Sequence, residues 1–153
     1  MELNEKVGNF TLQTDEDKSV SLSDYAGKPV VLFFYPKADT PGCTIEACGF
    51  RDAFEKLQRA GAVVLGISRD TPAAQAKFRA KYNLPFTLLA DVDEKVCKQF
   101  GVLKEKNMYG KKVMGIERTT FLIDPDQKLV HIFPKVKPEG HAEEVLAILK
   151  GKR

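Results

Sequence analysis

The sequence lacks tryptophan, has only three cysteines and two histidines, and contains no long hydrophobic run. Its longest apolar stretches, residues 30–35 and 62–67, are far shorter than the ~20 apolar residues that a membrane-spanning helix requires. Basic residues exceed acidic ones by only 24 to 21. So small an excess does not indicate binding to nucleic acid or to a membrane surface, and we expect neither partner.

The few cysteines restrict the kind of protein further. Residues 1–6 are polar and form no secretory hydrophobic segment, so we expect the chain to be cytoplasmic. In that reducing compartment, three cysteines are too few and too odd in number for a disulfide scaffold, which leaves packing, metal binding or redox chemistry. His131 and His141 lack ligand spacing to the cysteines, so we expect no metal site and no cofactor.

The length of 153 residues and the 43% of apolar residues indicate one globular domain, spanning 1–153. Strand-like apolar runs occupy residues 30–35, 63–68, 86–89, 119–124 and 128–133, and 10–14 with 19–23 predict an N-terminal β-hairpin. Helical patterns occupy residues 41–60, 72–83, 94–100 and 139–150. This order predicts an α/β fold whose mainly parallel central sheet is flanked by helices on both faces.

Two connections matter for this fold. The Asp-Pro-Asp-Gln segment 124–127 predicts a tight turn, which makes the last two strong strands antiparallel and the sheet mixed. Residues 102–117 match no regular element and are expected to form a long loop, either functional or a flexible charged connection.

Cys43 lies where a helix is expected to begin. A buried strand ends at Tyr35, Thr40 occupies the expected N-cap position, and Pro41 is the first helical residue. Free backbone N–H groups and the positive end of the helix dipole favour a thiolate there. The alternative is that Cys43 is a small core residue. Gly42 gives close access to the backbone from outside, which favours the reactive interpretation.

The other two cysteines differ from Cys43. Cys48 follows five residues later, so the pair does not have the Cys-x-x-Cys spacing of thiol–disulfide oxidoreductases or of common zinc sites. Cys48 is either a second buried cysteine on the same helix or a partner in redox chemistry. Cys97 is next to Val96 and three residues before Phe100, which indicates packing on an apolar face.

A longer pattern surrounds Cys43: Pro36-x-x-x-Thr40-x-x-Cys43, with Cys48 at a Cys-x4-Cys spacing and Arg118 just before a predicted core strand. This pattern resembles the peroxiredoxins, and most of all the subgroup called bacterioferritin comigratory protein or Q-type peroxiredoxin. The likeness covers essentially the whole chain. It implies a thioredoxin-like fold, in agreement with the predicted order of strands and helices.

The resemblance implies a role for each of these residues. The Cys43 thiolate would attack peroxide, the Thr40 hydroxyl would lie near the sulfur, and Arg118 would provide a permanent charge and a planar fork of donors. Pro36 would shape and dry the pocket. Glu46 matches an acidic family position and would hold an arginine. Without the resemblance, Thr40 is simply a helix cap, and Arg118 is a surface residue paired with a neighbouring acid.

The resemblance also implies the rest of the cycle. The sulfenic acid of Cys43 would condense with Cys48, and thioredoxin or a similar dithiol reductant would reduce the disulfide. Resolution within one chain needs no second subunit, and the C-terminal cysteine extension of obligate-dimer peroxiredoxins is lacking, so we expect a monomer.

Other functions compete with the peroxidase interpretation. A redox-sensing binding module switched by the same disulfide would use the same cysteines, and turnover would be incidental. A thiol–disulfide oxidoreductase acting on proteins is disfavoured by the Cys-x4-Cys spacing. The absence of tryptophan counts against a glutathione peroxidase, and the absence of a plausible His–Cys pair counts against a papain-like protease.

Overall fold

The computed structural model describes residues 1–151, apart from the side chain of Met108. Its strands are β1 (Thr11–Thr14), β2 (Ser19–Ser21), β3 (Val30–Phe34), β4 (Val63–Ser68), β5 (Thr87–Ala90), β6 (Leu103–Met108), β7 (Lys111–Ile116), β8 (Thr119–Ile123) and β9 (Leu129–Phe133). Its helices are η1 (Leu22–Tyr25), α1 (Pro41–Asp52), α2 (Phe54–Arg59), α3 (Pro72–Tyr82), α4 (Lys95–Gln99) and α5 (His141–Gly151). No helix within residues 1–151 is long and apolar enough to cross a membrane.

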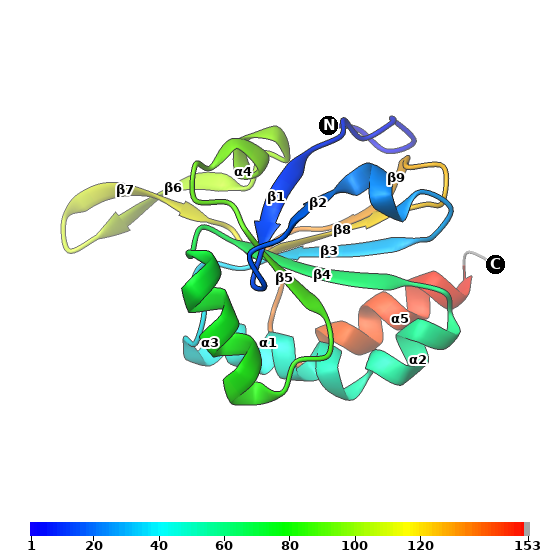
Figure 1. Cartoon of the computed structure of the whole chain (residues 1–153). Coiled ribbons are helices and arrows are strands. Elements are labelled where there is room, and N and C mark those ends of the chain that lie inside the picture. The colour runs from blue at the N-terminus through cyan, green and yellow to red at the C-terminus, as the bar shows by residue number, and fades with distance from the viewer. Residues whose placement is uncertain (152–153) are drawn as a thin grey trace.

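Seven strands form the central sheet in the order β2-β1-β5-β4-β3-β8-β9 (Figure 1). The predicted mixed sheet and N-terminal hairpin are confirmed, but parallel pairing is confined to β3–β4 and β4–β5, so the sheet is not mainly parallel. The hairpin joins the sheet through antiparallel pairing of β1 with β5. On the other side, β8 runs antiparallel to β3 and places Thr119 opposite Phe34. The start of β8 therefore lies at the carboxyl end of β3.

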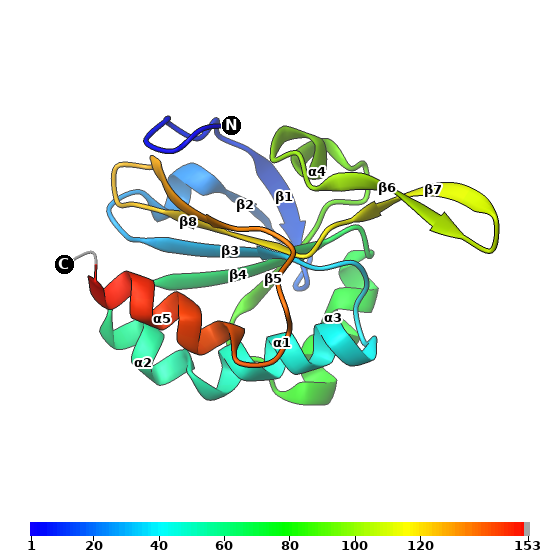
Figure 2. The same cartoon turned by 180° about the vertical axis from the view of Figure 1, so that it is seen from behind.

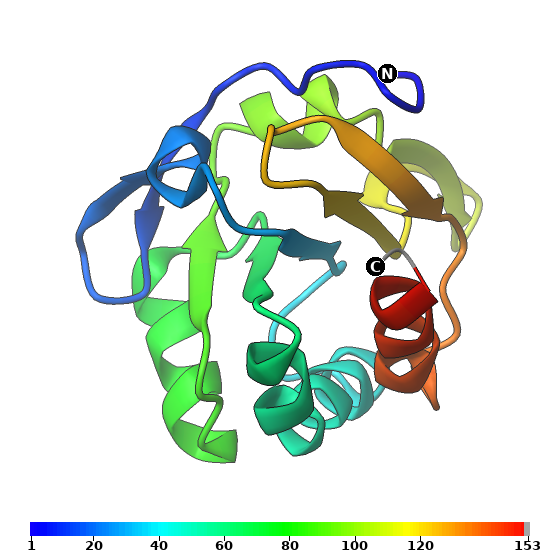
Figure 3. The same cartoon turned by 90° about the vertical axis from the view of Figure 1, so that its right-hand side faces the viewer.

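Both faces of the sheet are covered, as the strand β3 shows most clearly. All of its residues are buried. Val31 and Phe33 belong to one apolar cluster, and Val30, Leu32 and Phe34 belong to the other. This alternation follows from the two-residue repeat of a strand. Helices α1, α2, α3 and α5 lie on one face, while α4, η1 and the N-terminal segment lie on the other (Figures 2 and 3).

The predicted helix 41–60 is divided into two. Ala53, at φ −93° and ψ 0°, ends α1 and begins α2. The hydrogen bonds from Ala53 N–H to Gly49 and from Leu57 N–H to Ala53 continue across this point, so the apolar stripe that suggested one helix remains on one side. The periodicity therefore predicts the covered face correctly and the continuity wrongly.

The prediction of a loop at residues 102–117 is wrong. The strands β6 and β7 form a separate two-stranded antiparallel sheet that projects from the body (Figures 1 and 2). Tyr109 and Gly110 connect them with positive φ angles of 53° and 79°, which matches a two-residue turn of type I′. Tyr-Gly is not among the usual pairs for this turn, so the local sequence gives little signal for the hairpin.

Candidate active site

Cys43 lies in the first turn of α1, which starts at the edge of the sheet where β3 ends. Thr40 has the extended backbone of an N-cap residue, and Pro41 is the first helical residue, as the sequence indicates. The Cys43 side chain is only about 1% exposed and is a free thiol. The unpaired N–H groups of the first turn and the helix dipole both favour negative charge at this position.

The Thr40 hydroxyl does not cap α1. Its Oγ1 donates a hydrogen bond to the carbonyl of Lys37 at 2.8 Å. The proton of the hydroxyl is therefore committed to the loop, and the lone pairs of Oγ1 are left to accept a hydrogen bond. An O–H group of a substrate arriving beside Cys43 is a suitable donor. Pro36 lies in the same loop and is partly buried.

Arg118 reaches Cys43 from the start of β8. Its Nη1 lies 3.4 Å from the sulfur of Cys43 and 2.8 Å from Oε1 of Glu46. The antiparallel pairing of β3 with β8 brings the arginine to this place across 75 residues of sequence. The guanidinium also lies over Gly42, where an added Cβ would be 3.0 Å from Nη2, so a larger residue would require the guanidinium to shift by a few tenths of an ångström.

Glu46 is the most deeply buried charged partner in the site. Its side chain has no exposed surface, and within the described residues its Oε2 has no hydrogen-bond partner. Burial raises the pKa of Glu46 to about 7 against the opposing attraction of Arg118. The pKa of Arg118 is raised too, because Glu46 and Cys43 outweigh the lowering by burial. The arginine stays charged, and Glu46 is the member of the pair that takes up a proton.

Cys48 shares α1 with Cys43, but the helix holds the two apart. Five residues of helix give a rise of about 7.5 Å and place the two Cα atoms roughly 8.6 Å apart. A disulfide usually needs Cα atoms within about 6.8 Å. Both cysteines are free thiols, and Cys48 is partly buried.

Cys97 lies on the other face of the sheet from Cys43. It is fully buried in the cluster with Val96 and Phe100, as the sequence indicates. Burial, together with Asp91, raises its pKa far above the ordinary value. Its backbone N–H donates to Asp91 Oδ2 at 2.7 Å, which ties it to the end of β5.

The histidines are not brought together with the cysteines into a ligand set. His141 is buried, with Nε2 2.7 Å from the hydroxyl of Thr120, and burial lowers its pKa. Within residues 1–151, no group of three or more His, Cys, Asp or Glu side chains is placed to hold a metal ion.

Two residues near the site were not anticipated from the sequence. Asp70 accepts a hydrogen bond from the backbone N–H of Ala38, in the loop before α1, at 2.8 Å. In the sequence, the one feature that marks Asp70 is its position after a predicted parallel strand. Pro138 lies close to Gly42 and helps to enclose the start of α1, and nothing in its local sequence marks it.

Comparisons with known proteins agree with this geometry. The model of the AhpC/TSA family matches residues 3–132. A Coxiella burnetii chain named as peroxiredoxin bcp is 56% identical over 149 residues, which cover 97% of this chain and 99% of that one. Peroxiredoxin Bcp of Bacillus subtilis is 47% identical, with coverage of 98% and 96%.

Solved structures show the same likeness. A mutant of the peroxiredoxin PrxQ from Xylella fastidiosa superposes with a TM-score of 0.95 at 40% identity, covering 99% of this chain and 97% of that one. The bacterioferritin comigratory protein of Xanthomonas campestris, known for alkyl peroxide reduction activity, gives a TM-score of 0.90 at 44% identity, with coverage of 94% and 91%.

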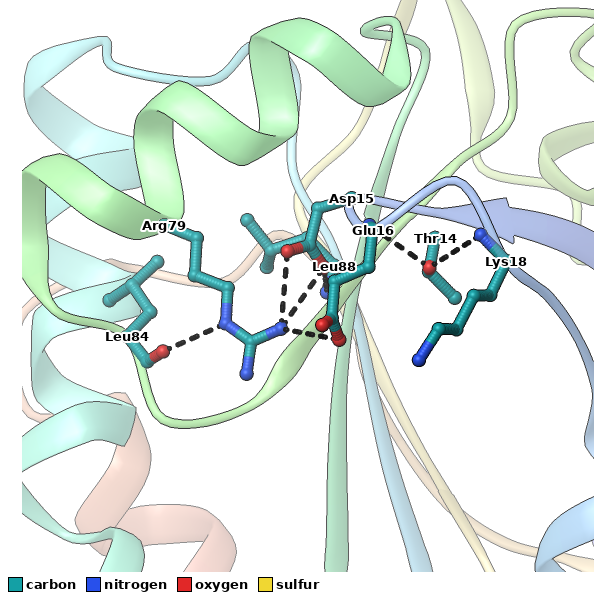
Figure 4. Close-up of polar contacts among 7 residues, drawn as sticks. All are labelled: Thr14, Asp15, Glu16, Lys18, Arg79, Leu84 and Leu88. Atoms are coloured by element: carbon teal, nitrogen blue, oxygen red, sulfur yellow. Dashed lines mark hydrogen bonds and ion pairs between the residues drawn. The ribbon is translucent and has the colours of Figure 1, made fainter.

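Arg118→Lys is expected to slow the reaction of Cys43 with peroxide by at least about tenfold, although the charge is retained. Nη1 of Arg118 contacts both Cys43 and Glu46 from the end of a rigid planar group, and the shorter, flexible lysine side chain does not hold its ammonium at that point. Stopped-flow oxidation of the reduced protein measures this rate. Arg79→Lys is the matched control, because Arg79 binds Asp15, Glu16 and Leu84 (Figure 4). If both variants react with peroxide at the same rate, Arg118 has no specific role in the oxidation of Cys43.

Glu46→Gln is expected to remove a pH dependence of stability. Between its ordinary pKa of 4.5 and the folded value of about 7, folded Glu46 holds a proton that the unfolded chain releases. The unfolded state binds fewer protons, so the free energy of unfolding falls as pH rises, by at most about 1.4 kcal/mol per pH unit. Urea unfolding at pH 5 and pH 7 should show that wild type loses stability relative to the variant. If the difference in the free energy of unfolding between wild type and variant is the same at pH 5 and pH 7, folded Glu46 is ionised at both pH values.

Proposed function

Because the chain belongs to the AhpC/TSA family and is a thiol peroxidase of the Bcp peroxiredoxin type, we propose that Cys43 is the residue that reacts with peroxide. The observation that carries this proposal is the contact of the Arg118 guanidinium with the Cys43 sulfur in the first turn of α1. An arginine and a helix N-terminus stabilise a thiolate without a general base. Hydrogen peroxide and organic hydroperoxides are the proposed substrates.

The chemistry uses groups that the site already holds. The Cys43 thiolate attacks one peroxide oxygen, the O–O bond breaks, and the other oxygen leaves with the bond electrons and takes up a proton as water or alcohol. Arg118 and the N–H groups of the first turn stabilise the charge that develops on the oxygens. Oγ1 of Thr40 accepts a hydrogen bond from the peroxide O–H, because its own proton is donated to Lys37. Pro36, partly buried in the loop before Cys43, limits the access of water to the sulfur from that side.

The sulfenic acid left on Cys43 then reacts with the thiol of Cys48. A disulfide forms and one water is released. Thioredoxin or a similar dithiol reductant reduces the disulfide by thiol exchange and restores both thiols. Since both cysteines lie in one helix of one chain, the cycle needs no second subunit, which supports a monomer. The three free thiols suit a reducing compartment, which supports a cytoplasmic location.

A steady-state assay with peroxide, thioredoxin and thioredoxin reductase tests the whole cycle. We expect sustained consumption of peroxide that depends on every component. A single slow oxidation without recycling would instead favour the redox-sensing module, in which the disulfide changes the affinity for a partner.

Replacement of each cysteine by serine should separate the three roles. Cys43→Ser should abolish turnover, because a serine hydroxyl is not ionised at neutral pH. Cys48→Ser should allow one attack and then accumulate sulfinic acid, which mass spectrometry detects as two added oxygens. Cys97→Ser should retain most of the turnover and lose mainly stability. Substantial turnover by Cys43→Ser, or loss of turnover by folded Cys97→Ser, would overturn these assignments.

The first turns of α1 are expected to unwind when the disulfide forms, because the intact helix holds Cys43 and Cys48 too far apart. Gly42 and Gly49 lie beside the two cysteines and lower the cost of that change. Hydrogen exchange at residues 42–50 should be faster in oxidised than in reduced protein, while α3 serves as the unchanged reference. Equal protection in both states, with the disulfide confirmed by mass, would show that the helix does not open.

A further inference from the structure

We propose that Asp70 is a positioning residue for the peroxidase reaction, which holds the loop of residues 36–40 rigid beside Cys43. This inference rests on the proposed role of Cys43. Asp70 follows β4, the neighbour of β3, and lies at the carboxyl end of the parallel strands. From there its carboxylate binds the backbone of the loop rather than a side chain of the pocket.

Asp70 is one end of a continuous polar network. Its Oδ2 accepts hydrogen bonds from the N–H of Ala38 at 2.8 Å and from the hydroxyl of Ser68 at 2.6 Å. The Ser68 oxygen accepts one from Nε2 of Gln75 at 2.9 Å. Oε1 of Gln75 in turn accepts the hydroxyl proton of Tyr35. The network therefore holds the chain at two points. One is Tyr35, directly before the loop, and the other is Ala38, in the middle of it.

The inner part of the network is buried and its orientations are fixed, while Asp70 and Ala38 at its outer end are partly buried. Tyr35, Ser68 and Gln75 have no exposed surface. The Gln75 amide also donates to the carbonyl of Leu89 in β5 at 2.9 Å, which determines which end of the amide faces Tyr35. A buried network in which each polar group has a partner is rigid, because any rotation leaves a group without its hydrogen bond.

A second tie to α3 is weaker. Asp39 has a left-handed backbone at φ 60° and binds Lys81 and the hydroxyl of Tyr82 at the end of α3. These groups are exposed, and exposed ion pairs contribute little to stability. The tie through Asp70 is therefore the main restraint on the loop.

The restraint matters because the loop carries Pro36 and Thr40. Thr40 binds Lys37 within the same loop, so a displacement of the loop backbone also moves the Thr40 hydroxyl. With the loop held, the unwinding that the disulfide requires is confined to residues after Thr40. Without it, Oγ1 of Thr40 and the first N–H groups of α1 shift relative to the sulfur, and a displacement near 1 Å can cost about 100-fold in rate.

Asp15 provides a matched control at the other end of the same helix α3 (Figure 4). Its carboxylate is about 5% exposed, binds Arg79 of α3 and accepts the backbone N–H of Leu88 at 3.0 Å. Like Asp70, it ties a loop to α3 and the sheet through a backbone hydrogen bond. Its loop, however, connects β1 to β2 and carries no residue of the proposed site.

The test compares Asp70→Ala, Asp70→Asn and Asp15→Ala in stopped-flow oxidation of Cys43 by hydrogen peroxide. Asp70→Ala should slow oxidation at least tenfold and speed hydrogen exchange at the Ala38 amide. Asp70→Asn keeps an acceptor oxygen and should restore most of the rate. Asp15→Ala should lower the denaturation midpoint and leave the oxidation rate within about twofold of wild type.

If Asp70→Ala does not fold, Asp70→Leu carries the same test, because it has about the size of the aspartate but cannot accept the N–H of Ala38. A wild-type rate in folded Asp70→Ala or Asp70→Leu, an equal slowing by Asp15→Ala, or no rescue by Asp70→Asn would overturn the proposal. Wild-type protein in which peroxide does not oxidise Cys43 would instead refute the proposed function, so the two failures are distinct.

Discussion

The charge of Arg118 is divided between a sulfur and a carboxylate, and the rest of the site depends on that division. Cys43 and Glu46 are three residues apart in α1, so one helical turn presents both acceptors to the same guanidinium. The guanidinium arrives there only because β8 pairs with β3 in the register that sets Thr119 opposite Phe34. The ion pair therefore depends at once on the register of the sheet and on the start of the helix, and a change in either would break it.

The protonation state of Glu46 changes how the charge of Arg118 is shared within the site. Enclosing a carboxylate whose second oxygen has no partner among residues 1–151 is unfavourable, and the pKa of about 7 expresses that cost. When Glu46 carries a proton, the charge of Arg118 acts mainly on Cys43. When Glu46 is ionised, its carboxylate and the sulfur of Cys43 share that charge. The electrostatic field at the sulfur is thus set partly by a neighbouring group that titrates near neutral pH.

Local signals account for what the sequence could predict. Thr40 and Pro41 mark the start of α1 within a few residues, so the placement of Cys43 follows from short-range physics. Arg118 is 75 residues from Cys43, and only the family resemblance singled it out. The capping bond expected of Thr40 is replaced by one to Lys37, since the preceding loop folds back on itself. Asp70 binds a backbone N–H, so no second side chain in the sequence points to it, and its position after a predicted parallel strand is its one signal.

The β6–β7 hairpin forms a two-stranded sheet of its own in the described part of the chain, so no further strand covers its two edges. Such edges are sites where proteins aggregate, and lysines along them are a common protection. Here the two short strands carry Lys104, Lys106, Lys111 and Lys112 against the single acid Glu105. Two copies approaching edge to edge repel one another, but only within a Debye length of about 8 Å at physiological salt. The protection that these lysines give to the edges of the hairpin therefore weakens as ionic strength rises.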